Sequence, residues 1–236
     1  MRRTHDKLTN IHHVKFRIKY YQRLLFSKSA VYINLFPDIS ILPDISVDKE
    51  YKISCLHEGN TRELIDFHDT YVWKWNYMFS AEDIEKRLIE GHRCFLAHKH
   101  QKLVGFMWIA VESVYSTDLL CIFDFPKNCI VSYNNFIRPD CRGENVLPGI
   151  RRFAFEEFSK SGYEKCYDYT LISNKSVIKS NQKFNACPIG KITYGYFFGY
   201  YFFLPYIGRN EGIEVRLVVD PWHRWRRYLR NKFMKG

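Results

Sequence analysis

The sequence predicts an α/β protein of the α+β type, in which helices pack on one sheet. Three observations lead to this prediction. Residues 129–191 have the pattern strand, tight polar turn, helix, strand, helix and extended segment. The apolar residues of 148–161 recur at helical spacing. An apolar fraction of 46%, with 17% aromatic residues, suffices for a packed core in a chain of 236 residues.

The helix at the centre of this pattern is predicted over Pro148–Ser161. Proline is tolerated in a first turn, and Gly162 suits the left-handed residue that ends a helix. A wide apolar stripe would face the core; it consists of Ile150, Phe153, Ala154, Phe155 and Phe158.

The polar turn Arg138–Asn145 joins the predicted strand Cys129–Ile137 to this helix. A strand, a glycine-containing turn and a helix start bring backbone N–H groups and the positive end of a helix to one place. Such a place suits an anionic phosphate group. The strand Lys165–Ser173 and a second helix, Asn174–Asn185, follow.

The remaining elements are predicted from periodicity and turn residues. Ser80 and Asp83 form a capping box at the start of one helix. In chain order the elements are a helix Lys15–Phe26, an extended piece Ala30–Phe36, a connector over 37–46, a strand Tyr51–Leu56, helices Thr61–Asp69 and Ser80–Glu90, a hairpin of Arg93–His98 with Leu103–Val114, a connection Tyr115–Asn128, an aromatic extended segment Lys191–Leu204 and a strand Glu214–Val219.

We therefore expect three parts. Residues 1–50 would form an N-terminal basic helix, strand and connector, 51–220 the main domain, and 221–236 a basic aromatic tail. The aromatic segment 191–204 would be a strand buried on both faces, or would line a groove for a lipid or acyl chain.

The turn Ile137–Leu147, Ile-Arg-Pro-Asp-Cys-Arg-Gly-Glu-Asn-Val-Leu, resembles the acyl-CoA pyrophosphate loop of the GNAT acetyltransferase superfamily. Asn174–Asn185 resembles the helix that follows in that family, and the resemblance covers roughly Lys52 to Lys191. It implies a mixed central sheet with helices on both faces. Two departures stand out, because Asn145 and Leu147 replace the second and third glycines of the loop. Asparagine tolerates positive φ, so we expect Asn145 to make the turn, whereas Leu147 keeps a phosphate further away than glycine would.

The resemblance implies acetyl-CoA or another acyl-CoA as co-substrate, transferring its acyl group directly to a small-molecule amine. The pantetheine arm would lie between two parted strands, Cys129–Ile137 and Lys165–Ser173. The implied cofactor-binding residues are Phe136, Ile137, Arg142, Gly143, Glu144, Asn145, Val146, Leu147, Asn174 and Lys183. Asn174 also precedes a helix, where it would serve as an N-cap.

Candidate catalytic residues are Tyr133 and Asn135, which would order a water, and Asn181, at the position of the family's general acid. The family's carboxylate is missing from the strand before the loop. The nearest carboxylates in the sequence are Glu112, Asp118 and Asp124. The sequence does not decide which of these groups is the general base.

No metal site is predicted, because His92, His98 and His100 lack a third ligand in a fixed element. The seven cysteines form no Cys-x-x-Cys pair, which suits a reducing compartment. No apolar run approaches the ~18 residues that cross a bilayer, and the N-terminus lacks a signal-peptide core. We therefore expect a cytoplasmic protein.

The formal net charge of +11 is concentrated at the two ends, over residues 15–26 and 222–234. Mixed basic and aromatic residues suit a helix lying on an anionic membrane, at the inner face, or a solvated helix whose aromatics pack on the domain. No nucleic-acid motif accompanies the charge. The oligomeric state is open, with a homodimer as one alternative.

Three functions follow from these observations. The first is an N-acyltransferase of GNAT type for an amino sugar, a lipid-linked saccharide or an amino-acid-like amine. The second is a protein of this fold with weak or no turnover that serves as a binding or membrane-associated scaffold. The third is a transferase whose donor is an acyl-carrier protein or an aminoacyl-tRNA.

Overall fold

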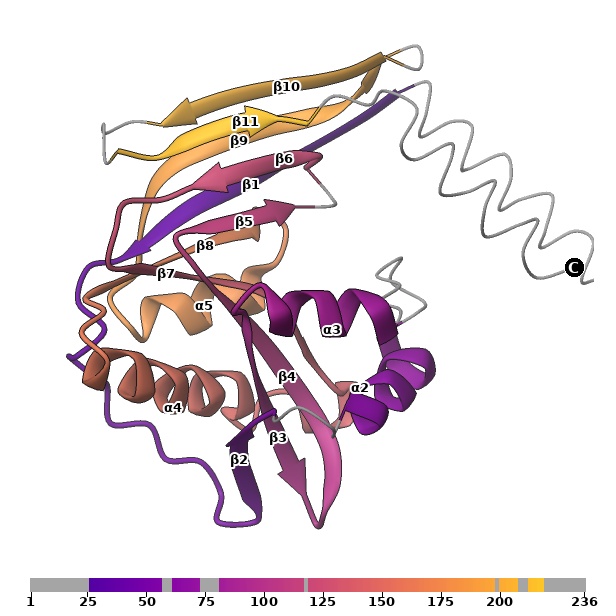
Figure 1. The fold of residues 1–236 in the computed structure, drawn as a ribbon, viewed down its shortest axis with the longest axis vertical. Coiled ribbons are helices and arrows are strands. Elements are labelled where there is room, and N and C mark those ends of the chain that lie inside the picture. Colours follow the sequence, from indigo (N-terminus) through magenta and orange to yellow (C-terminus); the bar gives the residue numbers. More distant parts are fainter. Residues whose placement is uncertain are drawn as a thin grey trace, which may run out of the picture.

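The computed structural model describes residues 26–56, 61–72, 81–116, 119–197, 200–207 and 212–218. Its centre is an eight-stranded mixed sheet with the order β10-β9-β1-β8-β7-β4-β3-β2, drawn in Figure 1. The strands are β1 Phe26–Phe36, β2 Tyr51–Cys55, β3 Arg93–Lys99, β4 Lys102–Val111, β7 Cys129–Ile137, β8 Lys165–Leu171, β9 Cys187–Phe197 and β10 Tyr200–Ile207. All described pairs are antiparallel except β7 with β8.

Helices cover both faces of this sheet, as predicted. On one face α4 (Val146–Lys160) packs its apolar stripe against β2, β3, β4 and β7, and α5 (Lys175–Gln182) lies beside α4. On the other face lie α2 (Thr61–Phe67), a π-helical turn His68–Val72, and α3 (Ala81–Ile89). Each face therefore has its own buried apolar cluster.

Left-handed residues set the ends of the two helices beside the turn. Asn145 has φ 59°, so α4 begins at Val146, two residues before the predicted start. Gly162 follows the end of α4 with φ 86°, as predicted. After α5, Asn185 adopts φ 56° and takes the role that glycine has at many helix ends, so the helix is shorter than predicted.

The strand β1 lies in the middle of the sheet, paired with β8 on one side and β9 on the other. The expected division at residue 50 had placed this strand ahead of the main domain. Val31, Ile33 and Leu35 are buried in one core cluster, and Phe36 is buried in the other. The strand β1 is therefore integral to the sheet. The predicted helices near 15–26 and 222–234 lie almost wholly outside the described residues, and Phe26 begins β1.

The predicted aromatic strand 191–204 is divided between two strands, β9 and β10, which pair antiparallel. The connection 115–128 also contains a strand that was not predicted, β6 (Cys121–Asp124). It pairs with β5 (Ser113–Ser116) and β11 (Glu214–Leu217) in a second, three-stranded sheet. Ring stacking joins the two sheets, because Phe123 lies over Tyr169 with ring centroids 5.1 Å apart.

Candidate active site

The parallel strands β7 and β8 pair over four positions and then part. The last pair is Ser132 with Asp168, and no described pair joins Tyr133–Ile137 to Tyr169–Leu171. A cavity of about 780 Å³ opens where they separate. Its lining comes from β1, β4, β7, β8, α4, α5 and β9, from the turn between β7 and α4, and from Leu119. The predicted separation of these two strands is therefore present.

A β-bulge lies in β7 at the point of separation. Phe136 faces Phe106 of β4 and Tyr133 faces Trp108, so two residues, Asn134 and Asn135, oppose one. Asn134 has φ 43°, and both asparagines line the cavity. Oriented with its oxygen towards α3, the Asn134 amide accepts from both Nη atoms of Arg87, at 3.1 and 3.2 Å. A bulge re-aims main-chain and side-chain groups, here towards the cavity.

The turn after β7 contributes the start of α4 to the cavity. Gly143 has φ 89° and Asn145 φ 59°, which confirms that an asparagine makes the turn in place of glycine. The first N–H groups of a helix have no intrahelical acceptor, and Val146 and Leu147 stand in this first turn. Leu147 is buried in the core. The turn can thus offer amides to an anion.

Three cationic side chains lie among the lining residues. The guanidinium of Arg142 lies 5.5 Å from the Phe136 ring centroid, and its Nε donates to the Ile137 carbonyl at 3.0 Å. The Nζ of Lys183 donates to Asn145 Oδ1 at 2.7 Å, which ties α5 to the turn. Lys179, one helical turn before Lys183, is the third. This set suits the binding of a diphosphate.

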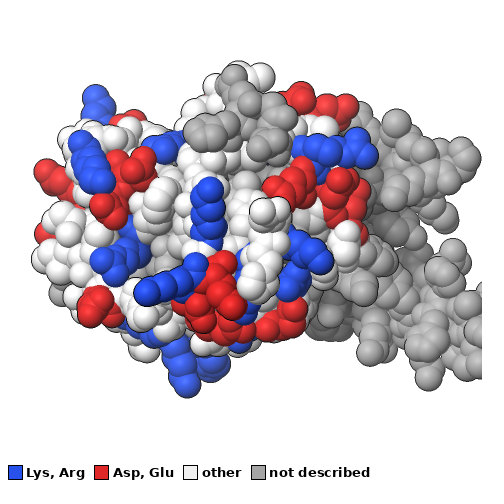
Figure 2. Space-filling view, turned by 90° about the horizontal axis from the view of Figure 1, so that it is seen from below, with Lys and Arg blue, Asp and Glu red and all other residues white. Residues whose placement is uncertain are grey.

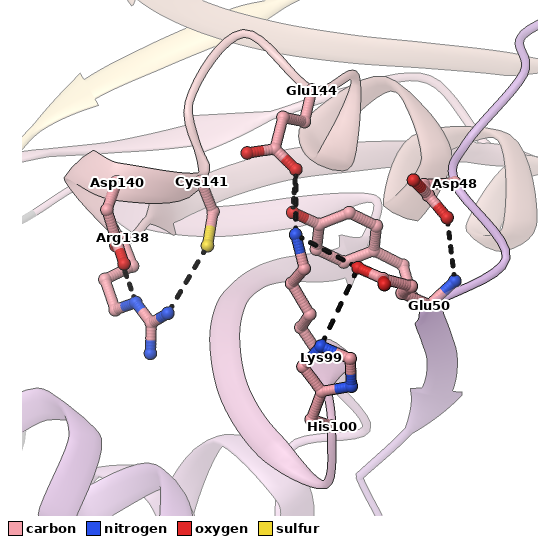
Figure 3. A network of polar contacts seen from close by, with 9 residues as sticks. Asp48, Glu50, Lys99, His100, Arg138, Asp140, Cys141 and Glu144 are labelled. Atoms are coloured by element: carbon pink, nitrogen blue, oxygen red, sulfur yellow. Dashed lines mark hydrogen bonds and ion pairs between the residues drawn. The ribbon is translucent and has the colours of Figure 1, made fainter.

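Glu144 is not among the residues that line the cavity. Its carboxylate belongs to a polar network with Lys99 (Figure 3). It accepts from the Tyr51 hydroxyl at 2.5 Å and from Lys99 Nζ at 3.2 Å. These two contacts lower the pKa of Glu144. Burial, and then the hydrogen bond to Glu144, raise the pKa of Tyr51 to about 12. Lys99 also pairs with Glu50 at 3.3 Å. The side chain with the wrong sign for a phosphate is thereby fixed to the hairpin edge of the sheet.

Predicted cofactor residues therefore fall in two groups. Lining the cavity are Phe136, Ile137, Arg142, Gly143, Asn145, Val146, Leu147, Asn174 and Lys183, whereas Glu144 does not line it. Asn174 also caps α5, since its Oδ1 accepts from Val177 N at 3.3 Å. Asn174 therefore both lines the cavity and caps α5, so the two predicted roles are compatible.

Of the predicted catalytic residues, Asn135 lines the cavity and two others do not. Tyr133 is 3% exposed, hydrogen-bonds to His92 Nδ1 and lies beneath the Arg87 guanidinium. Asn181 is 3% exposed, accepting from Arg151 Nη1 at 2.8 Å and donating to Asp168 at 2.7 Å. Both side chains are therefore held in buried networks and not at the wall of the cavity.

Two of the three carboxylates nearest in sequence, Glu112 and Asp124, do not line the cavity. Asp124 pairs with Arg216 at 2.7 Å, and that contact lowers the pKa of Asp124. Glu112 is not among the lining residues, and Asp118 lies outside the described ones.

Sequence reasoning missed several lining residues, among them Lys179, Thr170 and Tyr169. Lys179 precedes the predicted Lys183 by four positions on one helix, so helical spacing alone signalled it. Thr170 and Tyr169 face the cavity only because β8 leaves β7. No local pattern signals this.

Charge is balanced over the described core. Residues 1–25 contain seven Lys or Arg and one Asp, and residues 219–236 contain six and one. These segments supply the entire excess of +11, so residues 26–218 are formally neutral. Figure 2 shows basic and acidic side chains interspersed on one face of the core. Within the described ranges, no cluster of three or more His, Cys, Asp or Glu is arranged for a metal ion. No described helix combines the length and apolarity that a bilayer crossing requires.

No protein-family model matches the chain. Two solved structures share its fold with a TM-score of 0.52. A GNAT-family protein from Novosphingobium aromaticivorans is 12% identical over 72% of this chain and 64% of its own. An acetyltransferase of the GNAT family from Colwellia psychrerythraea is 9% identical over 72% of this chain and 56% of its own. Both proteins extend well beyond the matched region. The mixed sheet with its parted parallel strands therefore has the GNAT fold, as the resemblance predicted.

Proposed function

We propose that this chain is an acyl-CoA-dependent N-acyltransferase that passes an acyl group directly to an amine. The observation that carries the proposal is the cavity between β7 and β8. It joins a basic, amide-rich turn to the interior of the sheet, at the point where the strands part. A ligand with an anionic end and a long neutral arm has the shape and charge that this cavity accepts.

The anionic end of the donor would lie at the turn. Arg142, Lys179 and Lys183 supply positive charge, and the first amides of α4 supply hydrogen-bond donors. The pantetheine arm carries amide groups and would enter between the parted strands, bonding to main-chain groups as an added strand does. Asn174 stands beside that path.

The chemistry needs positioning more than covalent help from the protein. The amine nitrogen attacks the thioester carbon, the N–C bond forms, and the C–S bond then breaks to release the thiolate of CoA. Bringing the two reactants together supplies much of the rate. Main-chain N–H groups at the bulge would stabilise the oxyanion. The attacking nitrogen loses one proton, which a water held by Asn135 would accept and the departing thiolate finally takes.

Binding of acetyl-CoA, measured by isothermal titration, tests the proposal. Arg142→Glu should weaken binding roughly tenfold to a hundredfold, because a charge-assisted contact contributes about 1.5–3 kcal/mol. Lys127→Glu is the matched control, since Lys127 is exposed at the opposite end of β7. Absence of binding by the unaltered chain would remove acyl-CoA as the donor, and equal loss in both variants would remove Arg142 as a specific contact.

Two other functions are separated by further measurements. A scaffold without turnover would bind acetyl-CoA but release no thiol with panels of amino sugars, lipid-linked saccharides and amino-acid-like amines. A transferase that uses an acyl-carrier protein or an aminoacyl-tRNA would form product from those donors and not from acyl-CoA. The parted strands would admit the pantetheine arm of CoA and of an acyl-carrier protein alike, so the comparison of donors decides between them.

A further inference from the structure

The inner part of the cavity is apolar, in contrast to its mouth. The charged residues that line the cavity are Arg142, Lys179 and Lys183, at the turn and on α5. The inner part is lined by apolar or aromatic side chains from four strands and one connection; they are Val31, Phe106, Leu119, Tyr169 and Tyr194. All five belong to the core cluster on the α2–α3 face or pack against it.

The strand register shows how far this apolar part extends. Ile33 pairs with Tyr169 of β8, Val31 pairs with Ile192 of β9, and Tyr194 stands two residues beyond Ile192. Alternate residues of a strand share one face of a sheet, so Tyr169, Val31 and Tyr194 lie on the same face. From β8 across β1 to β9 is two strand spacings, or about 10 Å. The cavity thus continues sideways under the sheet, well past the gap between β7 and β8.

This sideways extension, the apolar wing, is enclosed by the three-stranded sheet. Leu119, beside that sheet, is fully buried, and its carbonyl accepts from the Tyr201 hydroxyl at 2.7 Å. Phe123 of β6 stacks on Tyr169, whose ring lines the wing. A wing covered in this way favours an apolar occupant.

We propose that the apolar wing holds the acyl chain of a donor longer than acetyl. This inference rests on the proposed function and names its donor class, a medium- or long-chain acyl-CoA. Mouth and wing belong to one continuous cavity, so one ligand with a phosphate end and an apolar end fills both. An acetyl group would end at the parting of the strands and leave the wing without an occupant.

Affinity measured along a series of acyl-CoA donors tests this inference on the unaltered protein. Isothermal titration would use CoA, acetyl-CoA, butyryl-CoA, hexanoyl-CoA and octanoyl-CoA. Each methylene that enters the wing should tighten binding by about fourfold, until the wing is full, since burying one methylene contributes about 0.8 kcal/mol.

A variant that fills the wing locates the effect. Val31→Trp should abolish the gain from longer chains, so that hexanoyl-CoA binds no more tightly than acetyl-CoA. Val218→Trp, the same substitution at an exposed position after β11, is the control and should keep the full gain.

The outcomes separate the two proposals. If hexanoyl-CoA binds no more tightly than acetyl-CoA, the apolar wing is not an acyl site. That result would leave the acyltransferase proposal intact. Absence of binding by every CoA species would instead overturn the proposed function. The chain-length series needs no substitution, so it tests the apolar wing as an acyl site even if Val31→Trp does not fold.

Discussion

Arg151 and Asp168 form an ion pair buried at the point where β7 and β8 part, with Nη2 and Oδ2 3.7 Å apart and the side chains 0% and 4% exposed. Burial lowers the pKa of the arginine and raises that of the carboxyl, so both charged forms are disfavoured by the surroundings. Asn34 and Asn181 each donate to the carboxylate, at 2.5 and 2.7 Å. The pair therefore joins β1, β8, α4 and α5 beneath the cavity.

Arg151→Ala should destabilise the fold by roughly 3–5 kcal/mol, because it leaves the Asp168 carboxylate buried without its countercharge. Urea unfolding measures the change. The matched control is Arg152→Ala, at the neighbouring half-exposed position, with an expected change of at most about 1 kcal/mol. Combining Arg151→Met with Asp168→Leu removes both charges but should recover only part of the loss, because the buried amides of Asn34 and Asn181 lose the carboxylate to which they donate. Equal losses in Arg151→Ala and Arg152→Ala would show that the buried pair contributes nothing particular.

The attachment of the turn through Glu144 should depend on pH. The folded-state pKa of Glu144 lies below its usual 4.5, first because of Tyr51 and then because of Lys99. A depressed carboxyl pKa adds stability above the unfolded pKa, and this stability is lost as pH falls through the folded value. The difference in unfolding midpoint between the unaltered chain and Glu144→Gln should shrink from about pH 6 to about pH 3. A constant difference would contradict the assignment. Glu156→Gln, on the exposed face of α4, serves as the comparison for a local helix pair.

Gly195→Ala should disturb the contact between β9 and β1. A Cβ at this position would lie 1.8 Å from the Ser27 carbonyl oxygen, so backbone must move. We expect a loss of about 1–3 kcal/mol or more in urea unfolding. Gly190→Ala, on the same strand, meets its nearest atom at 3.0 Å and should cost less. The reverse order of the two losses would argue against the register of β1 and β9.

We propose that the basic ends attach the protein to an anionic membrane surface, at its cytoplasmic side, because residues 26–218 are formally neutral and the ends carry the excess charge. Removing residues 221–236 should reduce sedimentation with phosphatidylserine vesicles, and salt should reduce it further. Neutral phosphatidylcholine vesicles are the control. Equal binding by the full and shortened chains would exclude a role for the C-terminal end.

Local patterns predicted the turn and its two helices because their signals lie within a few residues of each other. Gly162 ends α4 and Asn174 caps α5, and each acts on its own helix. The role of Tyr133 could not be inferred in this way. The bulge at Asn134 and Asn135 interrupts the alternation of β7, so Tyr133 and Phe136 pack against the same core cluster although they are three residues apart.

Partners distant in sequence explain the remaining differences. A polar Asn181 on a short helix is typical of a surface residue, but Arg151 and Asp168 bury it. The position of β1 in the sheet could not be predicted from local sequence either, because both neighbouring strands lie far along the chain. Strand propensity signals that a strand exists and carries little information about its partner.

The central place of β1 in the sheet has a consequence for folding during translation. Asn34 is synthesised 134 positions before its partner Asp168, and Leu35 is synthesised 152 before Cys187. Both edges of β1 therefore lack their hydrogen-bonding partners until β8 and β9 have been translated. Such distant pairings slow folding and leave apolar edges open to aggregation or to chaperones. The cavity at the parting of β7 and β8, which Val31 helps to line, can form only after these strands have paired.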